Sequence, residues 1–259
     1  FLLSDTKYPI LKLLRERSVP EQEISAKEED IREGLARSIL AARAAIDHGL
    51  DVLAQVDVLF AKAAFGIRTK ACECFHFVNC IRVEQFVHPL IFQDAVPIDL
   101  YLEDGIALVI SGVNGGGKTL AMKSFGLVCA MVRLGIPFAA RLGSVPAVVL
   151  FDEIVVSVGD QQDVQGGEST FTAKLNRYSA LLRQAADTSK SRLVLLDELG
   201  SGTEENAGGA IGQALLEQLL LNKACRVVAT THSARLKTWA FRHDEIGAAA
   251  VTLESAGGG

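Results

Sequence analysis

The chain has 259 residues and a net charge of −5, with 49% hydrophobic and 22% charged residues. This composition is typical of a soluble globular protein, and no apolar run reaches the roughly 18 residues that a membrane-spanning helix needs. The negative charge argues against a strongly basic nucleic-acid-binding surface over the whole segment, although a local basic patch stays compatible with it. The length suits one large α/β domain and a smaller one.

The first residues have neither a basic stretch nor a long apolar one, so the sequence predicts no signal peptide. Both ends are interpreted as arbitrary, with residues 257–259 as a linker or a truncation. Five cysteines, an odd number, favour a reducing compartment over a disulfide framework.

Four neighbouring residues raise the alternative of a zinc site: Cys72, Cys74, His76 and Cys80. The Cys-x-Cys-x-His spacing matches neither common zinc pattern, and no second pair follows it. We therefore expect small core residues of a strand, in which positions 72, 74 and 76 share one face.

A long helix, or two helices nearly in line, is predicted from about Glu21 to Ala64. At about 1.5 Å per residue it reaches on the order of 60 Å, which suggests a lever or a coiled arm. Gly34 and Gly49 are expected to weaken it locally. A composition shift near residue 70 predicts a helical lever or clamp segment at 1–70 and a second domain at 71–259. The apolar residues recur mostly three, four or seven apart, the period of one helical face: Ile24, Ile31, Leu35, Ile39, Ala42, Ile46, Leu50, Leu53 and Phe60.

Strand and helix patterns alternate after residue 70. This order predicts a mostly parallel, doubly wound α/β sheet. Ligands of such sheets bind at the carboxyl ends of the strands. Short β-prone pieces occupy residues 75–87; further strands are predicted at 106–111, 146–151, 192–198 and 226–232, and helices at 120–128, 169–188 and 207–221.

A glycine-rich stretch follows the strand at 106–111. Residues 112–119 fit the phosphate-binding pattern G-x-x-x-x-G-K-[ST] at every fixed position. Glycines let backbone N–H groups close around phosphate oxygens, and the next helix adds the positive end of its dipole. Lys118 is expected to reach the β- and γ-phosphates of ATP, and the Thr119 hydroxyl to bind Mg²⁺. The expected nucleotide-binding residues of this loop are Gly112, Val113, Asn114, Gly115, Gly116, Gly117, Lys118 and Thr119.

Two later strands end in residues with catalytic chemistry. The apolar strand at 192–196 runs into Asp197 and Glu198; Asp197 is expected to hold Mg²⁺ and Glu198 to polarise the attacking water. His232 ends the next strand, where it could contact the γ-phosphate and position that water. Strand-end carboxylates and single histidines also occur for structural reasons, but their meeting with the phosphate loop at one sheet edge favours catalysis.

A Glu after this Asp, together with a His after the next strand, is similar to the ABC ATPase class, whose members sandwich ATP between two subunits. Residues 166–171, Gly-Gly-Glu-Ser-Thr-Phe, stand where the signature of that class belongs. Ser169 would open a helix and meet the γ-phosphate held by the partner subunit. The transporter-type Leu-Ser-Gly-Gly signature is absent from the sequence.

The same motifs resemble the MutS family over residues 21–254. Residues 112–119 are similar to its Gly-Pro-Asn-x-Gly-Gly-Lys-[Ser/Thr], and the other matches are Ser169-Thr170-Phe171 as signature, 196–203 as Walker B and D-loop, and 230–232 as His switch. Residues 57–63, Met122-Lys123 and Gly126-Leu127 look like the recombination-suppressor branch, MutS-two, whereas Gly166-Gly167 is closer to the mismatch-repair branch. The departures are Val113 for a proline, Ile98 for an Asn near the adenine pocket, and Ser233 for an aromatic residue.

The resemblance implies a P-loop ABC-type ATPase domain that uses ATP and Mg²⁺ and is truncated here at its C-terminal end. It implies a homodimer, paired through this domain, that closes on branched or mismatched DNA in DNA repair and suppresses recombination. Such a protein is expected in the cytoplasm or at the nucleoid, or in an organelle stroma or matrix. A nuclease region, if there is one, lies outside the segment. The alternatives are an ATPase acting on stalled or collided ribosomes and an ABC-type clamp that does not hydrolyse ATP.

Overall fold

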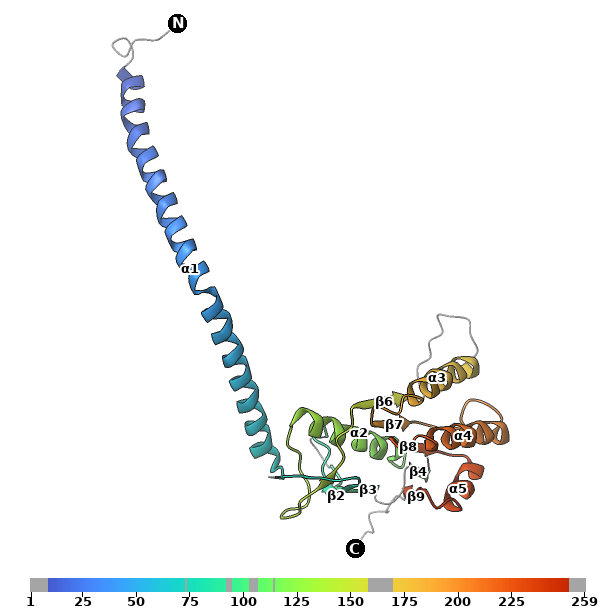
Figure 1. The fold of residues 1–259 in the computed structure, drawn as a ribbon. Helices are drawn as coiled ribbons and strands as arrows, with labels where there is room; N and C mark the ends of the chain where they lie inside the picture. The colour runs from blue at the N-terminus through green and yellow to red at the C-terminus, as the bar shows by residue number, and fades with distance from the viewer. Residues whose placement is uncertain are drawn as a thin grey trace. The chain divides into compact units, whose positions relative to one another are not determined.

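The structure is a computed structural model that describes residues 9–72, 74–91, 95–102, 107–113, 115–157 and 170–251 (Figure 1). Its helices are α1 (Pro9–Thr69), α2 (Lys118–Leu134), α3 (Thr170–Ala185), α4 (Glu205–Leu220) and α5 (Ala234–Phe241). Its strands are β1 (His76–Phe77), β2 (Ile81–Phe86), β3 (Ile98–Leu102), β4 (Ala107–Gly112), β5 (Ala147–Val148), β6 (Glu153–Ser157), β7 (Arg192–Leu196), β8 (Cys225–Thr231) and β9 (Ile246–Val251).

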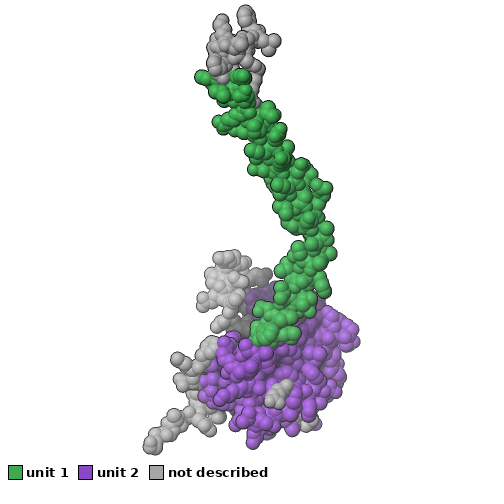
Figure 2. All heavy atoms as spheres, turned by 90° about the vertical axis from the view of Figure 1, so that its left-hand side faces the viewer, with its two compact units in different colours: residues 1–61 green, residues 62–259 purple. Residues whose placement is uncertain are grey.

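The chain divides into two compact units, residues 1–61 and 62–259 (Figure 2). The predicted domain limits, 1–70 and 71–259, stay a prediction. The first unit contains most of α1, which starts before the predicted helix and runs without interruption past Pro20, Gly34 and Gly49. No helix in the described part of the chain is long and apolar enough to cross a membrane. Side chains of the predicted apolar face are exposed in this unit, among them Ile24, Ile31, Leu35, Ile39, Ile46, Leu50 and Leu53.

The second unit is built on a five-stranded sheet in the order β6-β7-β8-β4-β9. Every neighbouring pair in it is parallel, so the predicted parallel α/β sheet is confirmed. The chain leaves β4 for the far edge at β6, returns through β7 and β8, and passes over β4 to β9. The order of strands therefore reverses beside β4, which is where ligands of open parallel sheets bind.

Alternate residues of the interior strand β4 pack into two separate hydrophobic cores. Leu108 and Ile110 pack into the core beneath α2, whereas Ala107 and Val109 pack into the core shared with α3, α4 and α5. This is the two-residue period of a strand that is buried on both faces. Helices thus cover both sides of the parallel sheet, and they fix the positions of its strand ends.

A second, smaller sheet in the order β1-β5-β2-β3 adjoins the α2 side through the same core. The predicted strand at 146–151 is wrong in extent and place, because only Ala147–Val148 pairs and it pairs in this small sheet. The edge strand of the parallel sheet is instead β6, which the sequence did not reveal. Its half-buried residues lack the continuous apolar pattern of an interior strand.

The cysteine-rich segment is not the single strand that its spacing suggested. Of the positions 72, 74 and 76, only His76 lies in a strand, and both His76 and Cys74 are exposed. Cys72 is half-buried and donates its S–H to the carbonyl of Phe138 across 3.2 Å. Within the described residues, no group of three or more His, Cys, Asp or Glu side chains is arranged to hold a metal ion.

Candidate nucleotide-binding site

The phosphate-loop segment joins the end of β4 to the start of α2, and its backbone requires glycine. Gly112 has φ +148°, and a Cβ there would lie 2.6 Å from the carbonyl oxygen of Val251 on β9. Gly115 and Gly117 have φ +76° and +89°, in the left-handed region that side chains disfavour. The loop is therefore a tight backbone turn without side-chain cover at these points. Asn114 lies outside the described residues.

Lys118 is buried inside this turn. Its Nζ donates to the carbonyl of Val113 across 2.8 Å and to the carbonyl of Gly112 across 3.1 Å, and the residue is 6% exposed. Both acceptors are neutral carbonyls, so neither of these contacts is an ion pair. A buried cation in a glycine turn at a helix N-terminus is the donor set that suits phosphate oxygens.

A threonine and an aspartate meet beside the loop. The Thr119 hydroxyl, in the first turn of α2, donates to Oδ1 of Asp197 across 3.1 Å, and Asp197 follows β7 directly. A second hydroxyl, that of Thr230 on β8, donates to the same Oδ1 across 2.6 Å. Oxygen ligands of this kind, hydroxyl and carboxylate together, are those that Mg²⁺ prefers. The residues present therefore fit the metal that the motifs imply.

Glu198 has a left-handed backbone at φ +49°, which is uncommon outside glycine. Its N–H donates to Oγ1 of Thr230 across 2.8 Å. Its carbonyl accepts from the N–H of Ser201 across 3.1 Å and from Nζ of Lys174 across 3.0 Å. Both peptide groups of this half-buried residue are thus held, one from β8 and one from α3.

His232 is exposed and follows the last residue of β8. Because β8 lies beside β7 in parallel register, with Leu196 opposite Ala229, His232 shares the sheet edge of Asp197 and Glu198. The described hydrogen bonds do not join it to either carboxylate. Ser169 lies outside the described residues, immediately before the first residue of α3.

The structure thus brings together Lys118, Thr119 and Asp197 with the glycine loop. Two further polar residues at this edge escaped the sequence analysis. Thr230 belongs to the Thr-Thr-His stretch, so its place next to a catalytic motif was a usable signal. No comparable indication pointed to Lys174, because its contacts form only when α3 packs against the loop after β7.

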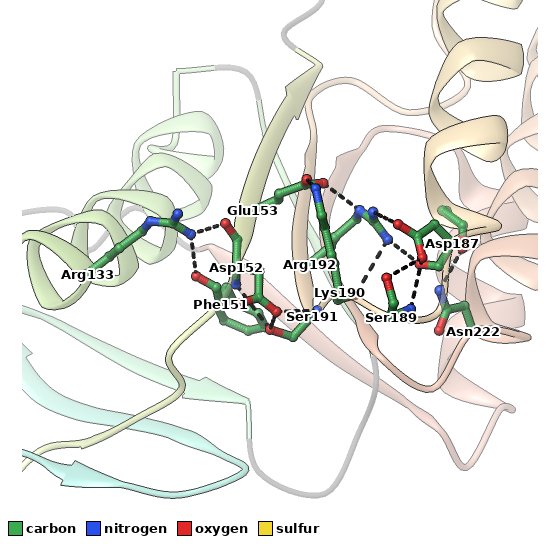
Figure 3. A network of polar contacts seen from close by, with 11 residues as sticks. Arg133, Phe151, Asp152, Glu153, Asp187, Ser189, Lys190, Ser191, Arg192 and Asn222 are labelled. Carbon is green, nitrogen blue, oxygen red and sulfur yellow. Dashed lines mark hydrogen bonds and ion pairs between the residues drawn. The ribbon is translucent and has the colours of Figure 1, made fainter.

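A separate polar network lies at the amino ends of β6 and β7, opposite to the strand ends that carry the site (Figure 3). Arg192 is buried at the start of β7 and forms ion pairs with Glu153 across 2.7 Å and with Asp187 across 3.2 Å. Asp152 accepts from the N–H and the hydroxyl of Ser191, both across 2.8 Å. These contacts join the amino ends of β6 and β7 to the end of α3. They border an open cavity of about 600 Å³ lined by residues of β6 and α3, away from the glycine loop.

Fold and site together define an α/β protein with a parallel sheet and a long N-terminal helix, whose carboxyl edge gathers a glycine loop, a buried lysine and a Thr–Asp pair. A comparison with family models matches residues 108–257 to MutS domain V. The chain therefore belongs to the MutS domain V family.

Similar curated proteins carry the name endonuclease MutS2. The protein of Caldanaerobacter subterraneus subsp. tengcongensis is 33% identical over 244 residues, covering 93% of this chain and 30% of the relative. That of Geobacillus sp. (strain WCH70) is 37% identical over 222 residues, covering 84% of this chain and 28% of the relative. That of Gemmatimonas aurantiaca is 36% identical over 231 residues, covering 86% and 27%. The chain thus spans less than a third of the length of these relatives.

Proposed function

We propose that residues 71–259 belong to a Mg²⁺-dependent ATPase domain of the P-loop ABC type, and that residues 1–70 are its helical lever or clamp segment. One observation carries the proposal. The hydroxyl of Thr119, directly after the buried lysine of the glycine loop, lies 3.1 Å from the carboxylate of Asp197. These are residues of two separate sequence motifs, both expected to hold the same metal ion.

Each residue has a role in this proposal. The backbone N–H groups of 112–117 and Lys118 bind the phosphates of ATP, and Thr119 and Asp197 hold Mg²⁺, which would neutralise phosphate charge when bound. Glu198 orients the attacking water and accepts its proton. His232, at the end of the neighbouring strand, contacts the γ-phosphate and helps to position that water.

The proposed assembly is a homodimer paired through the ATPase domain. Ser169 of one subunit would complete the site of the other by meeting its γ-phosphate at the N-terminus of α3. The hydroxyl would act only after ATP has bound to the loop of the opposite subunit. ATP-driven closure of the two subunits is then the step that couples nucleotide to function.

At the level of the whole protein, we place the chain in the MutS-two branch, acting on branched or mismatched DNA to suppress recombination, in the cytoplasm or at the nucleoid. The support is the similarity to proteins named endonuclease MutS2 over 84–93% of the chain. Because the segment is less than a third as long as those relatives, the DNA-contacting parts are to be sought in the full-length protein.

The test is nucleotide binding and phosphate release by the full-length protein, with and without Mg²⁺. Thr119→Ala should weaken the Mg²⁺ dependence of both, whereas Thr188→Ala, at an exposed threonine in the turn before β7, should change neither. Binding without turnover would support the non-hydrolysing clamp instead. Stimulation by branched DNA favours the MutS-two function, and stimulation by ribosomes alone favours the ribosomal alternative.

A further inference from the structure

The loop that follows β7 is held by a helix that belongs to none of the strand-end motifs. Lys174 on α3 extends its ammonium to three oxygens of this loop: the Glu198 carbonyl at 3.0 Å, the Ser201 carbonyl at 3.2 Å and the Ser201 hydroxyl at 2.8 Å. An ammonium has three donors, and all three have an acceptor here. Lys174 is thus a fully hydrogen-bonded lysine within the described part of the chain.

The position of Lys174 carries an energetic cost that its contacts offset. Burial lowers the pKa of Lys174, while the nearby negative charges of Glu198 and Asp197 act in the opposite direction. Withdrawing a cation from water is unfavourable unless it is hydrogen-bonded. An exposed polar residue at this position of α3 would avoid the cost of desolvation. We therefore look for a role of the Lys174 contacts in the loop itself.

The backbone of Glu198 indicates that role. At φ +49° a non-glycine residue is strained, and it keeps such a conformation only when its surroundings hold it there. The N–H of Glu198 is held by Thr230, which is part of the sheet, across 2.8 Å. Lys174 holds the carbonyl on the other side, and it belongs to α3, outside both the sheet and the loop.

A second residue of α3 contacts the same loop. Tyr178 lies four residues after Lys174, hence on the same face of the helix. It is 7% exposed, and the backbone of Gly200 hydrogen-bonds its phenol oxygen while burial raises its pKa to about 12. α3 therefore contacts residues 198–201 through two side chains that lie one helical turn apart.

We propose that Lys174 is a positioning residue for hydrolysis, which fixes the backbone of Glu198 and so the direction in which its carboxylate points. The inference rests on the proposed function, in which Glu198 is the general base. Lys174 itself touches neither nucleotide nor metal in this proposal. Its loss should therefore affect turnover and leave ATP affinity nearly unchanged.

The first measurement needs no nucleotide. In the full-length protein, Lys174→Met should speed amide hydrogen exchange in peptides covering residues 198–203, because the loop loses its anchor from α3. Arg177→Met removes an exposed cation from the same helix and should leave this exchange as in wild type. Unchanged exchange in Lys174→Met would overturn the proposal.

The second measurement separates positioning from a general loss of stability. Lys174→Met should lower kcat by about ten- to a hundredfold, since a 1 Å misplacement of a reacting group can cost about 10²-fold, with the Kd for ATP within about twofold of wild type. Lys174→Arg, which keeps the charge and several donors, should recover part of kcat. In a protein that already carries Glu198→Gln, Lys174→Met should lower kcat by less than about twofold, since both changes act on one group.

Equal kcat losses from Lys174→Met in both backgrounds, or unchanged kcat despite faster exchange, would show that Lys174 does not act through Glu198. If the wild-type protein binds ATP without hydrolysing it, the proposed function fails. The exchange experiment then still decides whether Lys174 holds the Glu198 loop.

Discussion

The hydroxyl of Thr230 donates to Oδ1 of Asp197 across 2.6 Å, and Oγ1 of Thr230 accepts a hydrogen bond from the N–H of Glu198 across 2.8 Å. One buried side chain on β8 thereby contacts both acidic residues that follow β7. Thr230 on the neighbouring strand and Thr119 on α2 therefore both hold Oδ1 of Asp197.

Replacement of this hydroxyl gives the first prediction. Thr230→Val keeps the shape but leaves the Glu198 N–H without its acceptor, which costs about 1–3 kcal/mol of stability when a buried donor is unpaired. The concentration of Mg²⁺ that gives half-maximal ATPase activity should rise. Thr230→Ser retains the hydroxyl and should stay close to wild type in both urea unfolding and Mg²⁺ titration; equal behaviour of the Ser and Val variants would contradict the assignment.

Lys118→Ala should abolish ATP binding. The phosphates lose the buried cation of the glycine loop, and hydrogen bonds to charged groups are the stronger ones. Binding of a fluorescent ATP analogue measures the effect, with circular dichroism as the check on folding. Lys123→Ala, at an exposed lysine of the same helix, is the matched control. Near-normal affinity of the Lys118 variant would remove the glycine loop from the proposed site.

Glu198→Gln should bind ATP normally and lose turnover by about 10²–10⁴-fold, the usual contribution of a general base. The amide can still hydrogen-bond water but cannot take its proton. Single-turnover phosphate release, measured with enzyme in excess over ATP, isolates the chemical step. Hydrolysis within a few-fold of wild type would mean that another group accepts the proton.

Two buried glycines should respond differently to the same added methyl group. A Cβ on Gly208 of α4 would lie 2.0 Å from the carbonyl oxygen of Gly200, whereas one on Gly126 of α2 would lie 2.5 Å from a methyl group of the Leu195 side chain. Backbone cannot move aside as a side chain can, so Gly208→Ala should cost more than about 2 kcal/mol and Gly126→Ala less. Urea unfolding of both variants measures the difference; the reverse order would contradict the close approach of α4 to the loop.

Asp187 should give a stability contribution that depends on pH. Hydrogen bonds from Ser189, together with Arg192, lower its pKa from 3.8 to about 2. A carboxyl with a lowered pKa in the folded state stabilises the protein above its unfolded pKa, and this contribution is lost as the pH falls toward about 2. Asp187→Asn should therefore be less stable than wild type at pH 7, and the gap should shrink between pH 4 and pH 2. Asp244→Asn, at an exposed aspartate, is the control; a gap that stays constant with pH would refute the linkage.

The sequence was most informative where a strand is buried on both faces. β4, β7 and β8 have largely apolar interiors and are followed by a glycine loop, two acids and a histidine, so their parallel arrangement and the meeting of their carboxyl ends could be predicted. β6 was missed because it lies at the sheet edge and is only half-buried, while the apolar run at 146–151 looked more like an interior strand than β6 did. The helix start was placed too late, since α1 continues through Pro20, and a proline usually interrupts a helix.

The contacts of Thr230 and Lys174 could be located only in the folded chain. The contacts of Thr230 depend on which strand lies next to β7, and those of Lys174 depend on which helix packs against the loop after β7. A sequence pattern does not specify either neighbour. Asp197 and Glu198 can be named from a motif, but the residues that hold them cannot. Lys174 lies 24 residues before Glu198, and Thr230 lies 32 residues after Glu198 and 33 after Asp197.

Helix α2 links two distant places in the second unit. It begins at Lys118, and at its other end the carbonyl of Leu134 accepts a hydrogen bond from Lys62, in the last part of α1. Next to this end, a Cβ on Gly66 would lie 2.9 Å from the ring of Pro137, so the two segments are closely packed there. Its 17 residues form a rod about 25 Å long, and packed protein interiors are hardly compressible. The phosphate loop and residues 62–66 are thus joined by a single regular helix, which makes α2 a direct structural connection between the site and the end of α1.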